Sequence, residues 1–105
     1  MEYKIIRIAL TTFSSENNAT HVVSQLLQKK LVACAQVEGP IKSRFFWENN
    51  FNQESEWRVI LKFSKALEKQ LFEEIHSIHE YDTPQWVVWN VEASSDYAEW
   101  INSRK

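Results

Sequence analysis

Residues that break regular structure are scarce in this 105-residue chain, which has one glycine (Gly39) and two prolines (Pro40 and Pro84). Few breakers mean few tight turns, so the sequence predicts long helices and strands. A single glycine also excludes the glycine-rich loops that bind nucleotide phosphates, and the chain has no Gly-x-Ser-x-Gly motif. We find no catalytic constellation and expect a protein that is not an enzyme.

Cysteine and excess charge are scarce as well. The one cysteine, Cys34, cannot form an internal disulfide, which favours a reducing compartment, so we expect a cytoplasmic protein. A formal net charge of -2 offers no basic surface to nucleic acid or to an anionic membrane. The apolar run at residues 5–10 is interrupted by Arg7 and is too short for an export signal or a membrane span. This length has room for one domain, residues 1–105.

Hydrophobic periodicity predicts strands that alternate with helices. One helix is expected after the capping pair Ser14-Ser15, with an apolar stripe that ends at Leu27 and with lysines in its last turn. A second is expected after Ser64, and a short one closes the chain. The segment 86–89 is apolar at every position, which predicts a strand buried on both faces. The expected strands cover residues 3–12, 31–37 continuing as 41–47 after a break at Gly39-Pro40, 57–63 and 86–89.

This order, βαββαβ plus a C-terminal helix, predicts the α+β class with the ferredoxin-like split β-α-β arrangement. Both long helices should then cover one face of a four-stranded sheet. The two middle strands form a long hairpin that turns through residues 48–50.

The predicted hairpin is too long for the helices that should cover it. Hairpin arms of about 12 residues reach roughly 40 Å, whereas a helix of about 16 residues spans about 24 Å. The uncovered part would expose a patch of large side chains, which favours self-association. The patch consists of Phe45, Phe46, Trp47, Phe51 and Trp57.

Several segments, in order and spacing along the whole chain, resemble the CutA (divalent-cation tolerance) family. They are Thr11-Thr12, LVACA at 31–35, FFWE at 45–48, WRVILK at 57–62, HEYDTP at 79–84 and DYAEWI at 96–101. The resemblance implies a homotrimer of ferredoxin-like subunits, similar in shape to the PII signalling proteins. It also implies a link to tolerance of copper and other divalent metals, and no family-wide catalytic activity.

The sequence departs from the family pattern at the metal ligands. Where metal-binding members of the family can have a cysteine, this chain has Thr11, and where they can have two adjacent histidines it has Ile78 and His79. Of the ligands that the resemblance implies, only His79 carries over. We therefore expect a divalent metal such as Cu²⁺ at His79, the alternative being that His79 only terminates a helix next to His76 and Glu80.

The resemblance also implies a cleft between subunits, and the matching positions are Trp47, Lys62 and Tyr81. Two functions follow as hypotheses. The first is a non-catalytic homotrimer for copper tolerance that binds metal ions at or between subunits. The second is a PII-like signalling or scaffolding trimer that binds a small anionic ligand or a partner protein in the cleft, where Lys62 would meet the anion. Glu54 and Glu56 share a strand face near the hairpin tip, and we expect both at the surface.

Overall fold

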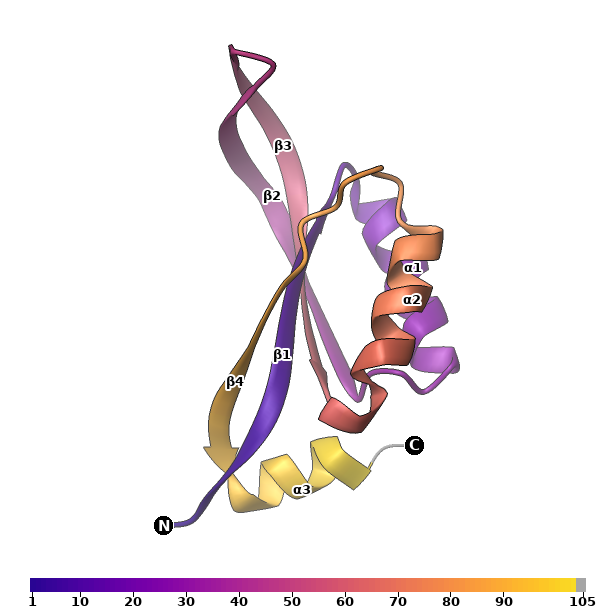
Figure 1. Ribbon diagram of the computed structural model, residues 1–105, viewed down its shortest axis with the longest axis vertical. Helices are drawn as coiled ribbons and strands as arrows, with labels where there is room; N and C mark the ends of the chain where they lie inside the picture. Colours follow the sequence, from indigo (N-terminus) through magenta and orange to yellow (C-terminus); the bar gives the residue numbers. More distant parts are fainter. Residues whose placement is uncertain (104–105) are drawn as a thin grey trace.

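A four-stranded antiparallel sheet in the order β2-β3-β1-β4 organises the computed structural model, which describes residues 1–103. Helices α1 and α2 cover one face of the sheet, and α3 lies across the end where the chain begins (Figure 1). This arrangement confirms the predicted ferredoxin-like fold. In chain order the elements are β1 (Tyr3–Phe13), α1 (Glu16–Gln28), β2 (Cys34–Trp47), β3 (Asn50–Phe63), the 3₁₀ turn η1 (Lys65–Leu67), α2 (Glu68–Ile78), β4 (Val87–Ser94) and α3 (Ser95–Ser103).

Helix α1 begins where its sequence predicts, but it ends before the two lysines that were expected in its last turn. The Ser15 hydroxyl accepts a hydrogen bond from the backbone N–H of Asn18 at 3.1 Å, which satisfies a donor that the first turn would leave free. The helix stops at Gln28 and Lys29 caps it, while Lys30 takes a left-handed conformation with φ of 58°. Strand β2 then starts at Cys34, three residues later than predicted, because residues 31–33 form a buried connection.

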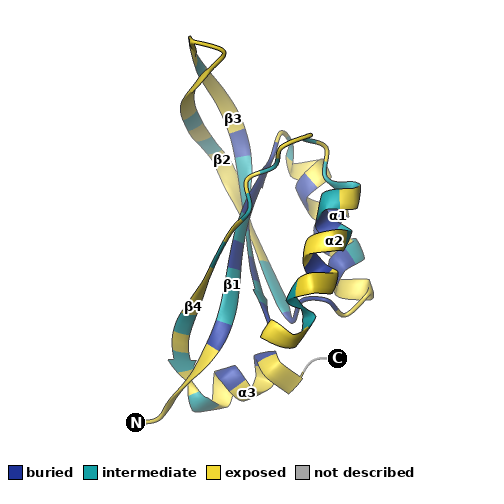
Figure 2. Ribbon diagram, in the orientation of Figure 1, coloured by how far each residue is buried: buried dark blue, intermediate teal, exposed yellow. Residues whose placement is uncertain are grey.

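The core lies between the two long helices and the sheet face beneath them. Alternate residues of β3 and the apolar stripes of both helices point into it, as the strand and helix periods predict. Figure 2 shows this buried layer along the helix side of the sheet. Its buried members are Ala9, Phe13, Ala19, Val22, Val23, Leu26, Leu31, Val32, Val59, Leu61, Phe63, Leu71 and Ile75.

The β2–β3 hairpin has a bulge at the predicted place. Pairing runs in register up to Glu38 opposite Arg58, shifts, and resumes with Ile41 opposite Glu56. The skipped residues are Gly39 and Pro40, joined by a cis peptide bond. The hairpin turns at Glu48 and Asn49, whose φ values of 52° and 65° are left-handed, as a tight turn between twisted strands requires.

The hairpin extends beyond both long helices (Figure 1) and gives the molecule a long axis of 47 Å. Strand β1 pairs with β3 only from Trp57 onward, so the outer part of β3 has β2 as its one neighbour among residues 1–103. Four of the five predicted aromatics are exposed on this outer part. Trp57 is the exception, because it points to the helix side and packs against the core.

Strand β4 corrects one prediction. It was expected to be buried on both faces, but it forms a sheet edge, and Val87 and Trp89 are 45% and 37% exposed. The helices cover only the face to which Val88 points, and α3 covers the opposite face only near Ile6. We call the uncovered part of that opposite face the open face; it includes Val87 and Trp89, with Leu10 paired to Val87.

A charged contact ties α2 to the sheet. The Arg7 guanidinium donates from Nε to Glu68 Oε1 at 2.8 Å and from Nη2 to Glu68 Oε2 at 3.0 Å. Its Nη1 also donates to Asn90 Oδ1 at 3.0 Å, so one side chain links β1, α2 and β4. The hydrogen bond from Arg7 holds the pKa of Glu68 below its usual value.

We expect Glu68→Gln to lower the free energy of unfolding by about 1–2 kcal/mol at pH 7, because it removes a partly buried charged hydrogen bond. A depressed carboxyl pKa stabilises the fold above the usual Glu pKa of about 4.3 and loses this effect as pH falls through the folded-state pKa. Urea unfolding should therefore show a smaller difference from the unmodified chain at pH 3 than at pH 7. The exposed Glu73→Gln is the matched control, and an equal loss in both variants would contradict the assignment.

Candidate functional site

Three segments meet at the root of the hairpin. They are the end of β1, the part of β3 just before Trp57 and the connection from α2 to β4. Helix α2 stops at Ile78 because His79, its C-cap, has the extended angles φ -69° and ψ 143°. The chain then runs back past the end of β1, which places residues 79–85 beside the sheet.

His79 is held in one tautomer. Its Nδ1 accepts a hydrogen bond from the backbone N–H of Tyr81 at 3.0 Å, so its proton is on Nε2. That nitrogen lies 3.0 Å from the Thr11 hydroxyl oxygen, to which it donates. The ring stacks on Phe13, with 4.3 Å between centroids. Burial lowers the pKa of His79, so the imidazole is neutral at pH 7.

The fold thus brings together Thr11 and His79, two of the three positions at which the family resemblance implies metal ligands, the third being Ile78. They do not fit a metal within one chain. Both imidazole nitrogens are engaged, a neutral hydroxyl replaces the soft thiolate, and no three His, Cys, Asp or Glu side chains gather for a metal within residues 1–103. His76 stacks on Phe72 at 3.9 Å between ring centroids, and its Nδ1 donates to the Phe72 carbonyl at 2.8 Å.

A pocket of about 690 Å³ opens between the β2–β3 hairpin and the connection after α2, which begins at His79. Its size is typical of sites for small organic molecules. Trp47 and Tyr81, two of the three predicted cleft residues, line it together. Its full lining is Thr12, Phe45, Trp47, Glu54, Glu56, Glu80, Tyr81, Asp82, Thr83 and Gln85.

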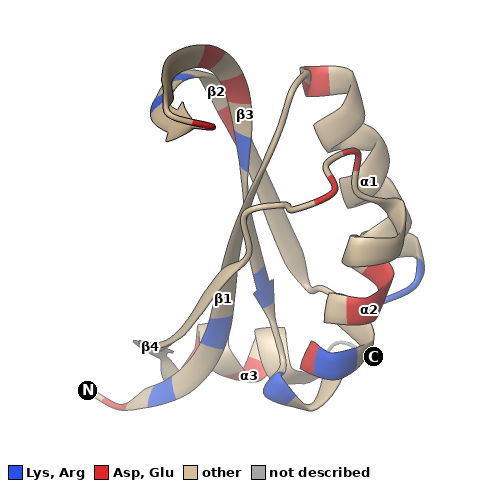
Figure 3. Cartoon of the chain, turned by 45° about the horizontal axis from the view of Figure 1, so that its top comes forward, with Lys and Arg blue, Asp and Glu red and all other residues tan. Residues whose placement is uncertain are grey.

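The pocket is acidic. Four of its lining residues are Glu or Asp and none is Lys or Arg, and Figure 3 shows the acidic positions on β3 and on the connection after α2. Glu56 is the innermost, only 9% exposed, and its Oε2 accepts the Tyr81 O–H at 2.9 Å. Burial and the nearby Glu56 carboxylate raise the pKa of Tyr81, so its hydroxyl remains a donor. Burial opposes ionisation of Glu80, but hydrogen bonds from Ser14 still hold the pKa of Glu80 below its usual value.

Glu56 corrects a prediction, because it was expected at the surface. The alternation of β3 places it on the same face as Arg58 and Ile60, but the connection after α2 folds over it. No signal in β3 itself predicts that cover. Glu54, one step further out, is exposed as expected.

Lys62, the third predicted cleft residue, lies elsewhere within the chain. Its ammonium group donates to the Tyr97 hydroxyl at 3.2 Å and lies 5.3 Å from the centre of the Tyr97 ring, beside α3. Lys62 is paired across the hairpin with Cys34, and neither residue lines the acidic pocket.

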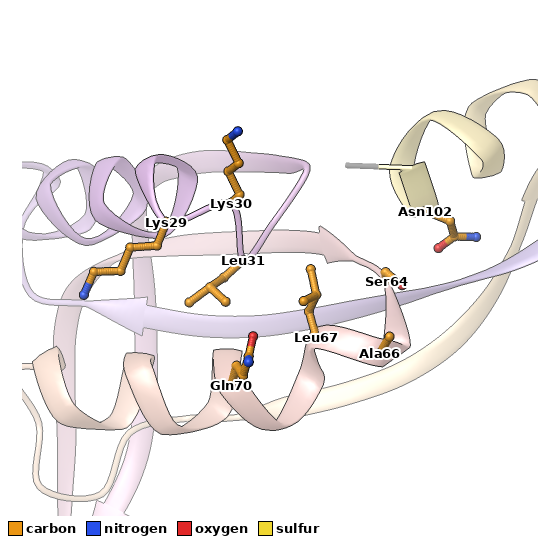
Figure 4. A pocket seen from close by; sticks show the side chains of 8 residues that line it. All are labelled: Lys29, Lys30, Leu31, Ser64, Ala66, Leu67, Gln70 and Asn102. Carbon is orange, nitrogen blue, oxygen red and sulfur yellow. The ribbon is translucent and has the colours of Figure 1, made fainter. Parts of the chain in front are cut away.

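A second pocket, of about 360 Å³, lies between the end of α1 and the start of α2 (Figure 4). Leu31 and Leu67 point into it, whereas the amino groups of Lys29 and Lys30 point away from one another. Lys29 Nζ forms an ion pair with Glu74 at 2.5 Å. The lysines therefore do not converge on a common anion position.

Comparison with known proteins places the chain in a family. The family model described as CutA1 divalent ion tolerance protein matches residues 7–104. The divalent-cation tolerance protein CutA of Thermotoga maritima is 33% identical over 95 residues, which are 90% of this chain and 93% of that protein.

Solved structures similar to this one are of proteins from the same family. The divalent ion tolerance protein CutA1 of Ehrlichia chaffeensis has a TM-score of 0.88 and 28% identity, covering 96% of this chain and 94% of that one. The periplasmic divalent cation tolerance protein CutA of Archaeoglobus fulgidus has a TM-score of 0.84 and 29% identity, covering 93% and 95%. No helix within residues 1–103 is long and apolar enough to cross a membrane. The chain belongs to the CutA1 divalent ion tolerance family.

Proposed function

We propose that this chain acts in divalent-cation tolerance as a non-catalytic homotrimer that binds metal ions, copper among them, at or between its subunits. The observation that carries the proposal is the open face of the sheet, which a lone chain leaves uncovered. Val87, Trp89 and the hairpin aromatics Phe46 and Trp47 expose large apolar surfaces there and on the hairpin. Such surfaces favour burial against further copies of the chain, and closed symmetry is the usual outcome.

His79 is the candidate metal ligand in this proposal. One chain offers a half-buried imidazole and the Thr11 hydroxyl, so the remaining ligands would come from a second copy or from water. A metal at Nε2 would require the His79 proton to lie on Nδ1, which in the lone chain accepts the Tyr81 N–H. Binding should weaken as pH falls, because only the neutral imidazole can be a ligand.

Calorimetric titration of the tag-free protein with Cu(II) and Zn(II) tests this role. We expect saturable binding of about one ion per chain that His79→Ala abolishes, because imidazole is a preferred ligand of both ions. The matched control is His21→Ala, since His21 is an exposed imidazole on α1 that shares a hydrogen bond with Gln25. Binding that is absent, or equal in both variants, would remove His79 from the proposal, and circular dichroism would verify folding.

The second hypothesis, a PII-like trimer that binds a small anionic ligand or a partner protein, keeps some support from the pocket that Trp47 and Tyr81 share. The four carboxylates of that pocket repel an anion, and Lys62 does not line it within one chain. The pocket's electrostatics favour a cationic ligand.

We also propose a cytoplasmic location, on the strength of the single cysteine. The Archaeoglobus fulgidus relative is described as periplasmic, so fractionation of the expressing cells decides between the two compartments.

A further inference from the structure

In the part of the chain that the structure describes, the four carboxylates of the acidic pocket have no positively charged side chain beside them. None of its four carboxylates forms an ion pair with Lys or Arg within residues 1–103, since the ion pairs found there involve Glu38, Glu68, Glu74 and Glu99. No histidine of the described residues lines the pocket either. Negative charge that is partly removed from water and has no cation beside it is costly.

Glu56 is the one buried carboxylate of the four, since Glu54, Glu80 and Asp82 are exposed. It is nine-tenths buried, and its one hydrogen bond among the described residues is from Tyr81 to Oε2. The second oxygen, Oε1, has no hydrogen-bond partner in residues 1–103. Every fully buried side-chain oxygen or nitrogen among these residues does have a partner, so Oε1 is not fully buried. Oε1 is therefore open to the pocket that Glu56 lines. A hydrogen-bond donor or a cation in the pocket would give Oε1 of Glu56 a partner.

The walls of the pocket limit the kind of cation. Phe45 and Trp47 are exposed on β2 and line the pocket with the Tyr81 ring. Aromatic faces attract ammonium groups and cover methylene chains. The carboxylates are not gathered as a metal set, and about 690 Å³ is far larger than one ion needs.

We propose that this pocket binds an organic cation of the aliphatic amine class, with one ammonium group at Glu56 and its methylene chain against Trp47 and Phe45. A second ammonium group would lie toward Glu54 and Asp82, so a diamine fits better than a monoamine. This binding goes beyond metal tolerance and requires neither His79 nor a metal ion. The ammonium group could come from a free amine or from a Lys or Arg of a second copy of this chain, and we favour the free amine because the pocket has room for a whole molecule.

The test is a calorimetric titration of the 105-residue protein, as it assembles in solution, with 1,5-diaminopentane in the presence of EDTA. Pentane-1,5-diol and glutarate have the same chain length with neutral and negative ends. We expect saturable binding of the diamine alone, weakened by added salt because the attraction is electrostatic. Equal binding of the diol, or no binding of the diamine, would overturn the proposal.

Glu56→Gln keeps the shape of the side chain and an acceptor for Tyr81 but removes the charge. We expect it to weaken diamine binding at least about tenfold, since a charged hydrogen bond contributes more than about 1.4 kcal/mol. Glu92→Gln, an exposed carboxylate outside the pocket, should bind as the unmodified chain does. If Glu56→Gln fails to fold, Glu54→Gln at the exposed side of the pocket replaces it, and unchanged affinity there would count against the proposal.

Two further measurements distinguish a free amine from a Lys or Arg of a second copy, and amine binding from metal binding. If a neighbouring copy supplies it, the diamine will not bind and Glu56→Gln will shift the oligomer toward monomer in light scattering, which overturns the free-amine assignment. His79→Ala should leave diamine affinity unchanged even if it abolishes metal binding. Failure of metal binding and failure of amine binding are therefore distinguishable.

Discussion

Trp89→Glu should convert the proposed trimer to a folded monomer, as measured by light scattering at micromolar concentration. Trp89 lies on the open face opposite Ile8, and it is already 37% exposed in the lone chain. A glutamate there is therefore tolerated by the monomer. In an assembly that covers the open face the same carboxylate is buried without a partner, at about 3–5 kcal/mol for each copy.

The matched control is Leu27→Glu. Leu27 is 40% exposed, but it is on α1, in the layer on the other side of the sheet. This variant should keep the oligomeric state of the unmodified chain. Dissociation of both variants, or of neither, would show that the open face is not the surface that copies share.

Gly39→Ala should be among the most destabilising of small substitutions in this chain. A Cβ at Gly39 would lie 2.6 Å from Trp57 Cδ1, 2.7 Å from Trp57 Cγ and 3.0 Å from the Glu56 carbonyl oxygen. The indole cannot easily retreat, because Trp57 packs against the core. We expect a loss of about 1–3 kcal/mol, as for other overpacked sites, with a fall in Tm of about 4–8 °C for each kcal/mol.

Two comparisons isolate the clash. Glu38→Ala alters the neighbouring residue and removes only a surface ion pair with Arg58, so it should cost less than about 1 kcal/mol. Trp57→Leu should remove the obstacle, so that adding Gly39→Ala to it costs less than in the unmodified chain. Additive losses in the double variant would show that Trp57 is not the residue that limits position 39.

Much of the fold was predictable because local signals in this chain agree with one another. Apolar stripes at the helical period, capping at Ser15 and alternation along residues 57–63 each specify an element and the face it buries. The order of elements then allows few topologies. Strand β4 was predicted wrongly in its burial, because an apolar run does not distinguish a central strand from an edge strand whose outer face is left for another surface.

The candidate site was less predictable, because its contacts join residues far apart in the chain. The resemblance pointed to Trp47 and Tyr81, and they share a pocket. It could not indicate that His79 would be occupied on both nitrogens, since this follows from where α2 ends and from the turn at Tyr81. The burial of Glu56 depends on a connection that starts 23 residues after it, which is the distance from Glu56 to His79.

The outer part of the hairpin has a consequence for local stability. From residue 50 to residue 56, strand β3 is hydrogen-bonded to β2 alone, and a two-stranded ribbon is at best marginally stable in water. In a lone chain we expect this ribbon to open at a smaller free-energy cost than the inner sheet, which opens only with the core. The protection of β3 amides against hydrogen exchange should therefore change near Trp57. Protection of the inner part reports the stability of the core, and protection of the outer part reports contacts between the ribbon and another surface.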